Sequence, residues 1–171
     1  FLEKRNEEIK ERTDKNGVTS LMRFCAGGAL RQVVRIWQKE PHRFDAAAND
    51  GRTVINFAAR SLPCLRFVLK KGKTRYNFSP LADACEMPAD IDRRLDLLIR
   101  AGMDINAANP ETETPLIVAA QTFNVRALNR LIAEGADKTI KNAEGKTAYD
   151  IVAQNSAVFD FGCLPEKLKP Y

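Results

Sequence analysis

The residue types that could do chemistry are few and far apart in this chain of 171 residues. His42 is the single histidine and follows Pro41, in what we expect to be a turn between helices. One imidazole without a cluster of Cys or carboxylate ligands cannot complete a zinc site of the usual kind. Gly27-Gly28 lacks the strand–loop–helix context of a phosphate-binding loop. The sequence therefore predicts no metal site and no cofactor.

The four cysteines, Cys25, Cys64, Cys85 and Cys163, contain no C-x-x-C pair. We expect Cys25 and Cys85 at small-residue positions of buried helices, where a thiol behaves as a small apolar group. Reduced, buried thiols are favoured over zinc ligands or disulfides, which favours a reducing compartment such as the cytoplasm. A Cys–His nucleophile pair with His42 would require one of these thiols to leave the core.

Asp83 and Glu86 are three residues apart and share one face of an expected helix. Paired carboxylates can serve as general acid and base, but on a helix they usually form a solvated or partner-facing patch. We therefore predict no catalytic residues, and we predict that the protein is not an enzyme.

A short pattern recurs five times and places these residues on a scaffold. Each copy starts with Thr or Ser, continues with a Leu-like residue and ends in small residues, and its anchors are Thr19, Thr53, Ser79, Thr114 and Thr147. The anchors are 34, 26, 35 and 33 residues apart. A period near 33 predicts a solenoid, in which each unit buries its apolar face against its neighbours.

These motifs resemble the ankyrin repeat. The family's T-P-L-H-x-A-A is matched by Thr114-Pro115-Leu116 with Ala119-Ala120, and its L-L-x-x-G-A-D by Leu131-Ile132 with Gly135-Ala136-Asp137. The family's His after Leu is absent from every copy, where Met22, Asn56, Ala82, Ile117 and Asp150 stand instead. Its local hydrogen bonds must therefore be missing or replaced.

The same spacing also has a physical explanation. A Thr or Ser hydroxyl at each anchor suits a helix N-cap, and Pro80 and Pro115 suit the first helical position. Apolar residues at steps of three and four predict a second helix in each complete unit. Gly72, Gly102 and Gly135 then stand where helices end in a left-handed residue. We predict an all-α solenoid of about five helix-turn-helix repeats joined by finger turns.

The repeats run from residue 14 to residue 155, and the ends differ from them. Residues 1–13 are rich in charges of both signs and predict a polar capping helix. Residues 156–171 contain Pro165 and Pro170, so they predict either a cap folded over the last repeat or a frayed tail. Because the chain begins at Phe1 and not at Met, we expect a fragment or a processed form, with a signal peptide or further domains left open.

Charge is distributed unevenly. Residues 1–75 carry 17 Lys/Arg and 8 Asp/Glu, whereas residues 76–171 carry 10 and 14. A basic half could attract nucleic acid or an anionic lipid surface, but a bipolar surface without such a partner is the preferred interpretation. The basic residues show no stripe with stacking aromatics, which argues against nucleic acid. The sequence contains no run of 18 apolar residues, so it predicts no membrane-spanning helix.

Ankyrin repeats generally bind proteins through the concave face made by fingers and inner helices, so the resemblance implies a protein-binding module. We expect it to be a monomer. We predict a cluster of apolar and charged residues in mid-groove: Arg52, Phe57, Arg60, Tyr76, Phe78, Asp83, Glu86, Met87, Glu111 and Glu113. An exposed aromatic cluster with a charged rim is typical of an interface hot spot. Alternatively, Tyr76 and Phe78 fill the space left by the shortened second unit. The repeats could also be the non-catalytic arm of a larger enzyme or pathogen effector.

Overall fold

A computed structural model describes residues 13–72, 75–155 and 164–169. These residues are helical and contain no strand, apart from one isolated bridge between Ala47 and Thr53. They divide into two compact units, residues 1–75 and 76–171. The all-α architecture predicted from the repeated pattern is confirmed.

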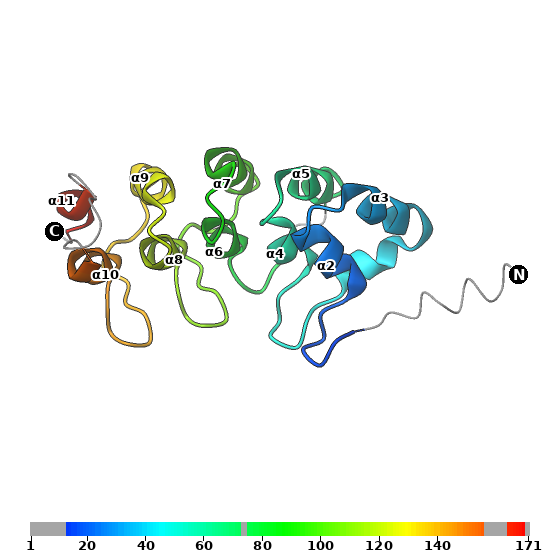
Figure 1. Cartoon of the computed structure of the whole chain (residues 1–171), viewed down its shortest axis with the longest axis horizontal. Coiled ribbons are helices and arrows are strands. Elements are labelled where there is room, and N and C mark those ends of the chain that lie inside the picture. The colour runs from blue at the N-terminus through cyan, green and yellow to red at the C-terminus, as the bar shows by residue number, and fades with distance from the viewer. Residues whose placement is uncertain (1–12, 73–74, 156–163, 170–171) are drawn as a thin grey trace, which may run out of the picture. The chain divides into compact units, whose positions relative to one another are not determined.

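Unit 1 contains two helix pairs and a short 3-10 helix. Inner helices α2 (Ser20–Ala26) and α4 (Val54–Ala58) pack together, and outer helices α3 (Leu30–Lys39) and α5 (Leu62–Lys70) cover them. The 3-10 helix η1 (Pro41–Asp45) follows α3 and packs against it. Figure 1 shows the inner pair in one row and the outer pair in a second row.

Unit 2 continues the same arrangement. Its inner helices are α6 (Pro80–Cys85), α8 (Pro115–Gln121) and α10 (Ala148–Asn155), and its outer helices are α7 (Ile91–Arg100) and α9 (Val125–Ala133). The last helix, α11 (Leu164–Leu168), lies against α9 and α10 (Figure 1). Within this unit, the inner helix α8 packs between α6 and α10.

The anchors start the inner helices, as predicted. The hydroxyls of Thr19, Thr114 and Thr147 each accept a backbone N–H from the first turn. Thr53 and Ser79 also stand at N-caps, but the Thr53 hydroxyl donates to the carbonyl of Arg75, and the Ser79 hydroxyl caps no N–H.

Three copies replace the hydrogen bond expected of the absent His. The Met22 sulfur accepts the Thr19 N–H at 3.5 Å, and Asn56 Oδ1 accepts the Thr53 N–H at 3.0 Å. Asp150 Oδ2 accepts both the N–H and the hydroxyl of Thr147, each at 2.8 Å. Each acceptor stands three residues after its anchor and forms a capping box.

The core follows the predicted periodicity. The inward Leu or Ile residues and the small pairs of the inner helices are buried, among them Leu21, Ile55, Leu81, Leu116, Ala58, Ala59, Ala84, Cys85, Ala119 and Ala120. Two apolar residues of the helices lie less deep: Tyr149 is half-buried, and Val125 is exposed. Val125 begins α9, where the helix end leaves its side chain outside the packed row.

The outer helices end as predicted, because Gly72, Gly102 and Gly135 all have positive φ. Asp90 stands at the N-cap of α7 with φ 52°, but its side chain caps no N–H. The extra residues before α7 are held differently. Arg94, buried in α7, donates from its guanidinium to the carbonyl oxygens of Met87 and Ala89.

The predicted end segments fall mainly outside the described residues. The capping helix expected over residues 1–13 overlaps them only at Thr13. In the C-terminal segment, the structure describes α11, whose Leu168 is fully buried. The boundaries of the three predicted regions stay predictions.

Candidate partner-binding surfaces

Four finger loops are built on the same backbone pattern. Each is closed by an N–H to C=O bond across five residues, at Asp14–Val18, Ala48–Arg52, Asn109–Glu113 and Asn142–Lys146. The fourth residue of each finger is left-handed; it is Gly17, Gly51, Thr112 or Gly145. The finger expected before Ser79 includes residues 73–74, which lie outside the described part of the chain.

The two fingers of unit 1 are tied together, because the Asn49 N–H donates to the Asn16 carbonyl at 2.9 Å. A Cβ added to Gly17 would lie 2.3 Å from Asn49 Oδ1, so this contact requires glycine. In unit 2, the link lies in the turns that precede the fingers, where the Asp137 N–H donates to Asn106 Oδ1 at 2.9 Å.

Unit 1 contains three of the predicted binding residues. Arg52 pairs with Asp50 at 2.7 Å, and its guanidinium carbon lies 5.8 Å from the centre of the Phe57 ring. Phe57 and Arg60 are half-buried. Arg52 and Phe57 thus form a polar–aromatic pair at the junction of a finger and α4. Arg60 directly follows α4 and its C-cap residue.

Unit 2 contains the other seven. The Tyr76 hydroxyl accepts the Asp104 N–H at 3.2 Å, which links the start of this unit to the turn that follows α7. Phe78 and Glu86 are half-buried. Asp83 is 5% exposed, contrary to the outward orientation that we expected, because every residue of α6 is buried. Whether Phe57 of unit 1 joins Tyr76, Phe78 and Met87 in one cluster stays a prediction.

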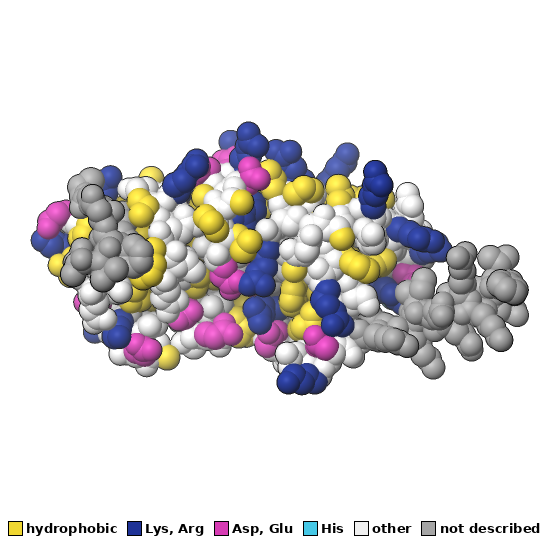
Figure 2. Space-filling model, in the orientation of Figure 1, with side chains coloured by type: hydrophobic (Ala, Val, Ile, Leu, Met, Phe, Trp, Pro, Cys, Tyr) yellow, Lys and Arg dark blue, Asp and Glu magenta, His cyan; other side chains and the backbone are white. Residues whose placement is uncertain are grey.

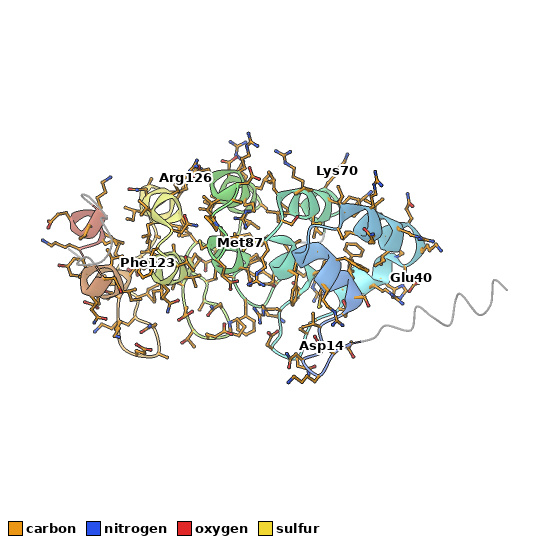
Figure 3. The ribbon with its side chains drawn as sticks, in the orientation of Figure 1. Asp14, Glu40, Lys70, Met87, Phe123 and Arg126 are labelled. Atoms are coloured by element: carbon orange, nitrogen blue, oxygen red, sulfur yellow. The ribbon has the colours of Figure 1, made fainter. Side chains whose placement is uncertain are left out.

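Met87 is the most exposed large apolar residue in the described part of the chain, at 44%. It lies in the turn between α6 and α7, at the end of an inner helix (Figure 3). The buried Arg94 holds this turn through the Met87 and Ala89 carbonyls. The side chain of Met87 is therefore exposed on a turn whose backbone is held in place by Arg94.

The acidic residues of the third described finger differ from each other. Glu113 accepts hydrogen bonds from Gln121 of α8 and from Asn109 of its own finger. Glu111 is exposed at the tip and has no side-chain bond with a described residue. Glu113 helps to connect the finger to the inner helix, and Glu111 is available to a partner.

A surface hollow of about 310 Å³ lies where α7 and α9 begin, lined by Asp90, Asp92, Arg93 and Arg126. Arg126 pairs with Asp92, and Arg93 lies 3.6 Å from Asp90. Its walls are charged side chains that neutralise each other. It lacks the apolar lining that small-molecule sites usually have.

The thiols lie where the sequence predicted. Cys25, Cys64 and Cys85 are buried and free, and Cys163 lies outside the described residues. Burial raises the pKa of Cys85 to about 12. A hydrogen bond to Cys64, together with burial, raises the pKa of Cys25. Protonated thiols of this kind are poor nucleophiles. His42 is exposed in η1, and no group of three or more potential metal ligands gathers among the described residues.

Sequence reasoning missed one surface, on the outer helices of unit 1. Arg31, Arg35 and Lys39 are exposed at successive steps of four residues along α3. This spacing could have been found in the sequence between the apolar positions of the same helix. The basic residues of α3 therefore form a row, although not one with stacking aromatics.

Comparison with known proteins indicates the family that the repeats resemble. The family described as ankyrin repeats in many copies matches residues 98–152, which run from the end of α7 into α10. Residues 98–152 are thus similar to ankyrin repeats. Ankyrin repeats generally serve as protein–protein interaction modules and generally do not catalyse reactions.

Two curated relatives match part of the chain. A protein of Rickettsia bellii named as an ankyrin repeat protein is 45% identical over 51 residues, which are 30% of each chain. Alpha-latrotoxin-Lh1a of Latrodectus hasselti is 38% identical over 64 residues, 36% of this chain and 5% of the toxin. The matches thus cover under a third of either relative and identify the repeats alone.

None of the helices that the structure describes combines the length and the apolar character needed to cross a bilayer.

Proposed function

We propose that this chain is a non-catalytic module that binds another protein through the face formed by its fingers and inner helices. The observation that carries the proposal is the set of four fingers, each closed by a backbone hydrogen bond, with the two of unit 1 also joined to each other. A surface that is already ordered loses little conformational entropy when it binds. The residues at its tips are exposed and polar, as a solvated recognition surface requires.

Within this face, Met87 and Glu111 are the residues best placed to contact the partner. Met87 offers an apolar side chain on a fixed turn, and Glu111 offers a carboxylate at a fingertip. The other predicted residues also belong to the proposed interface, but a smaller fraction of each residue is exposed to solvent. Asp83 contributes least, because little of its carboxylate reaches solvent.

Affinity capture with the intact protein tests the proposal. Met87→Glu combined with Glu111→Lys changes the proposed face, while Val125→Glu combined with Glu134→Lys makes the same chemical changes on the outer helix α9. All four positions are exposed, so both variants should fold. We expect the first variant to lose proteins that the parent and the control retain. Equal capture by both variants would contradict the proposal.

We also propose that the protein acts as a monomer in a reducing compartment, the cytoplasm. The free, buried thiols of Cys25, Cys64 and Cys85 support this assignment, because disulfides are rare where glutathione keeps thiols reduced.

A further inference from the structure

The outer helices of unit 1 expose a set of cationic side chains, and these two helices contain no acidic side chains that could neutralise them. We call this set the cationic face; it consists of Arg31, Arg35, Lys39, Arg66, Lys70 and Lys71. Neither α3 nor α5 contains an Asp or Glu. None of the six forms an ion pair or a side-chain hydrogen bond with the residues that the structure describes.

The cationic face has two rows. Arg31, Arg35 and Lys39 follow one another every fourth residue, so their row along α3 is about 12 Å long. Arg66 and Lys70 repeat this step on α5, and packed helices lie about 8–10 Å apart. Figure 2 shows Lys and Arg side chains along the edge made by α3 and α5, and Figure 3 places Lys70 on that edge.

An aromatic cluster fixes the two rows. The Trp37 ring of α3 lies 6.3 Å from Phe67 of α5, and 5.1 Å from Phe44 of η1. The Lys71 ammonium lies over both Trp37 and Phe67, at 5.2 and 5.6 Å from their ring centres. The cations are therefore presented on a rigid pair of helices rather than on loops.

The outer helices of unit 2 show that repeat geometry does not require this charge pattern. There, Arg126 of α9 pairs with Asp92 of α7, and Arg130 pairs with Asp96 at 3.3 Å. Like charges four residues apart on a helix destabilise it slightly. Unit 1 keeps such repulsion, and binding a polyanion would relieve it.

The shape of the cationic face distinguishes between nucleic acid and a membrane surface as its binding partner. The Trp37 and Phe67 rings pack edge-on within their cluster, so they are not available to stack on bases. The face lies along the sides of two helices, and it carries no projecting element that could enter a nucleic-acid groove. A bilayer instead offers a broad surface whose anionic headgroups move laterally to meet fixed cations.

We propose that the cationic face docks unit 1 on an anionic phospholipid membrane surface. The described residues of unit 1 include no large, strongly exposed apolar side chain, so the docking is electrostatic and inserts nothing into the acyl layer. Clusters of four to eight Lys or Arg residues on an amphipathic helix are a known basis for binding anionic lipid. The fingers lie away from these outer helices in unit 1 and stay free for a partner protein.

Vesicle co-sedimentation tests the proposal with the intact protein. We expect binding to phosphatidylcholine vesicles that contain about 30 mol% phosphatidylserine, and none to phosphatidylcholine alone. Raising NaCl from about 0.05 M to about 0.5 M should release the protein, because screening shortens the range of the attraction. Binding to neutral vesicles, or binding that resists salt, would overturn the proposal.

A pair of matched variants locates the surface. Arg31→Gln/Arg35→Gln/Arg66→Gln removes three charges from the cationic face, and Arg93→Gln/Arg100→Gln/Arg126→Gln removes three from exposed positions on α7 and α9. We expect the first to weaken vesicle binding at least tenfold and the second to leave it unchanged. Equal loss in both would show that net charge alone is responsible, and the proposal would fail.

Two further measurements complete the test. Lys39→Gln/Lys70→Gln, which changes other members of the same face, should reduce vesicle binding by a smaller factor, and unchanged binding would contradict the assignment. Fluorescence anisotropy with duplex DNA and RNA at the same salt should show weaker binding than to the anionic vesicles. Tighter binding to nucleic acid would replace the membrane with a nucleic-acid partner.

Discussion

At the scale of single residues, the starts of the inner helices are capped by different hydrogen-bond acceptors. A helix start leaves backbone N–H groups without partners, and Met22, Asn56 and Asp150 each accept the anchor N–H three residues upstream. Where the third residue is Ala82, the Ser79 N–H donates to the Ala108 carbonyl of a finger instead. The His typical of the family is thus replaced by other acceptors in three copies.

The Asp150 cap predicts a pH dependence of stability. The N–H and hydroxyl of Thr147 donate to its carboxylate and hold its pKa below the usual value. A carboxyl whose pKa is lower in the folded state stabilises the fold above its unfolded-state pKa, and this contribution disappears as pH falls through the folded-state pKa. Asp150→Ala should therefore lower Tm at pH 7 more than at acid pH.

Thermal unfolding of parent and variant between pH 7 and about pH 2 measures this difference. The comparison must be made between the two proteins, since Asp137 also has a lowered pKa and adds its own pH dependence to both. A Tm difference that stays constant across this range would exclude a charge-dependent cap at Asp150.

At the scale of elements, the repeats depend on small residues between inner helices. Ala119 is fully buried in α8, which packs against α6 on one side and α10 on the other. Ala119→Leu should overpack this row and lower the free energy of unfolding by about 1–3 kcal/mol. Ala133→Leu makes the same substitution at an exposed position of α9 and should change it by less than about 0.5 kcal/mol.

Chemical denaturation of the two leucine variants provides the measurement. Because both substitutions add the same side chain to a helix, helix propensity cancels in the comparison. If Ala119→Leu were as stable as Ala133→Leu, the close packing of inner helices would not hold in solution.

At the scale of the whole molecule, two units of opposite net charge meet at residues 75 and 76. The predicted mid-groove cluster draws on both, with Phe57 from unit 1 and Tyr76, Phe78 and Met87 from unit 2. If these residues form one hot spot, Phe57→Ala and Tyr76→Ala should each weaken partner binding by about 2 kcal/mol. Titration of the captured partner against each variant measures the effect.

Tyr76→Phe is the control for this prediction. It removes the hydroxyl that accepts the Asp104 N–H, and it should lower stability by about 0.5–1.5 kcal/mol while the ring remains to bind. If Tyr76 acts only as a link to the turn that follows α7, Tyr76→Ala and Tyr76→Phe will lose stability without losing affinity. Full affinity in both alanine variants would end the hypothesis of a shared cluster.

The sequence by itself determined the helical repeats and the buried small residues, because periodicity and capping are local properties. Only the tertiary structure showed that Arg94 reaches back to the Met87 turn, that Asp83 is covered, and that Thr112 adopts the left-handed conformation that glycine adopts in the other fingers. Only packing, likewise, could place Trp37 beside Phe67 and bring the cations of α3 and α5 together. Local spacing specifies which face of a helix is polar, but the neighbour that shares that face depends on contacts between residues far apart in the chain.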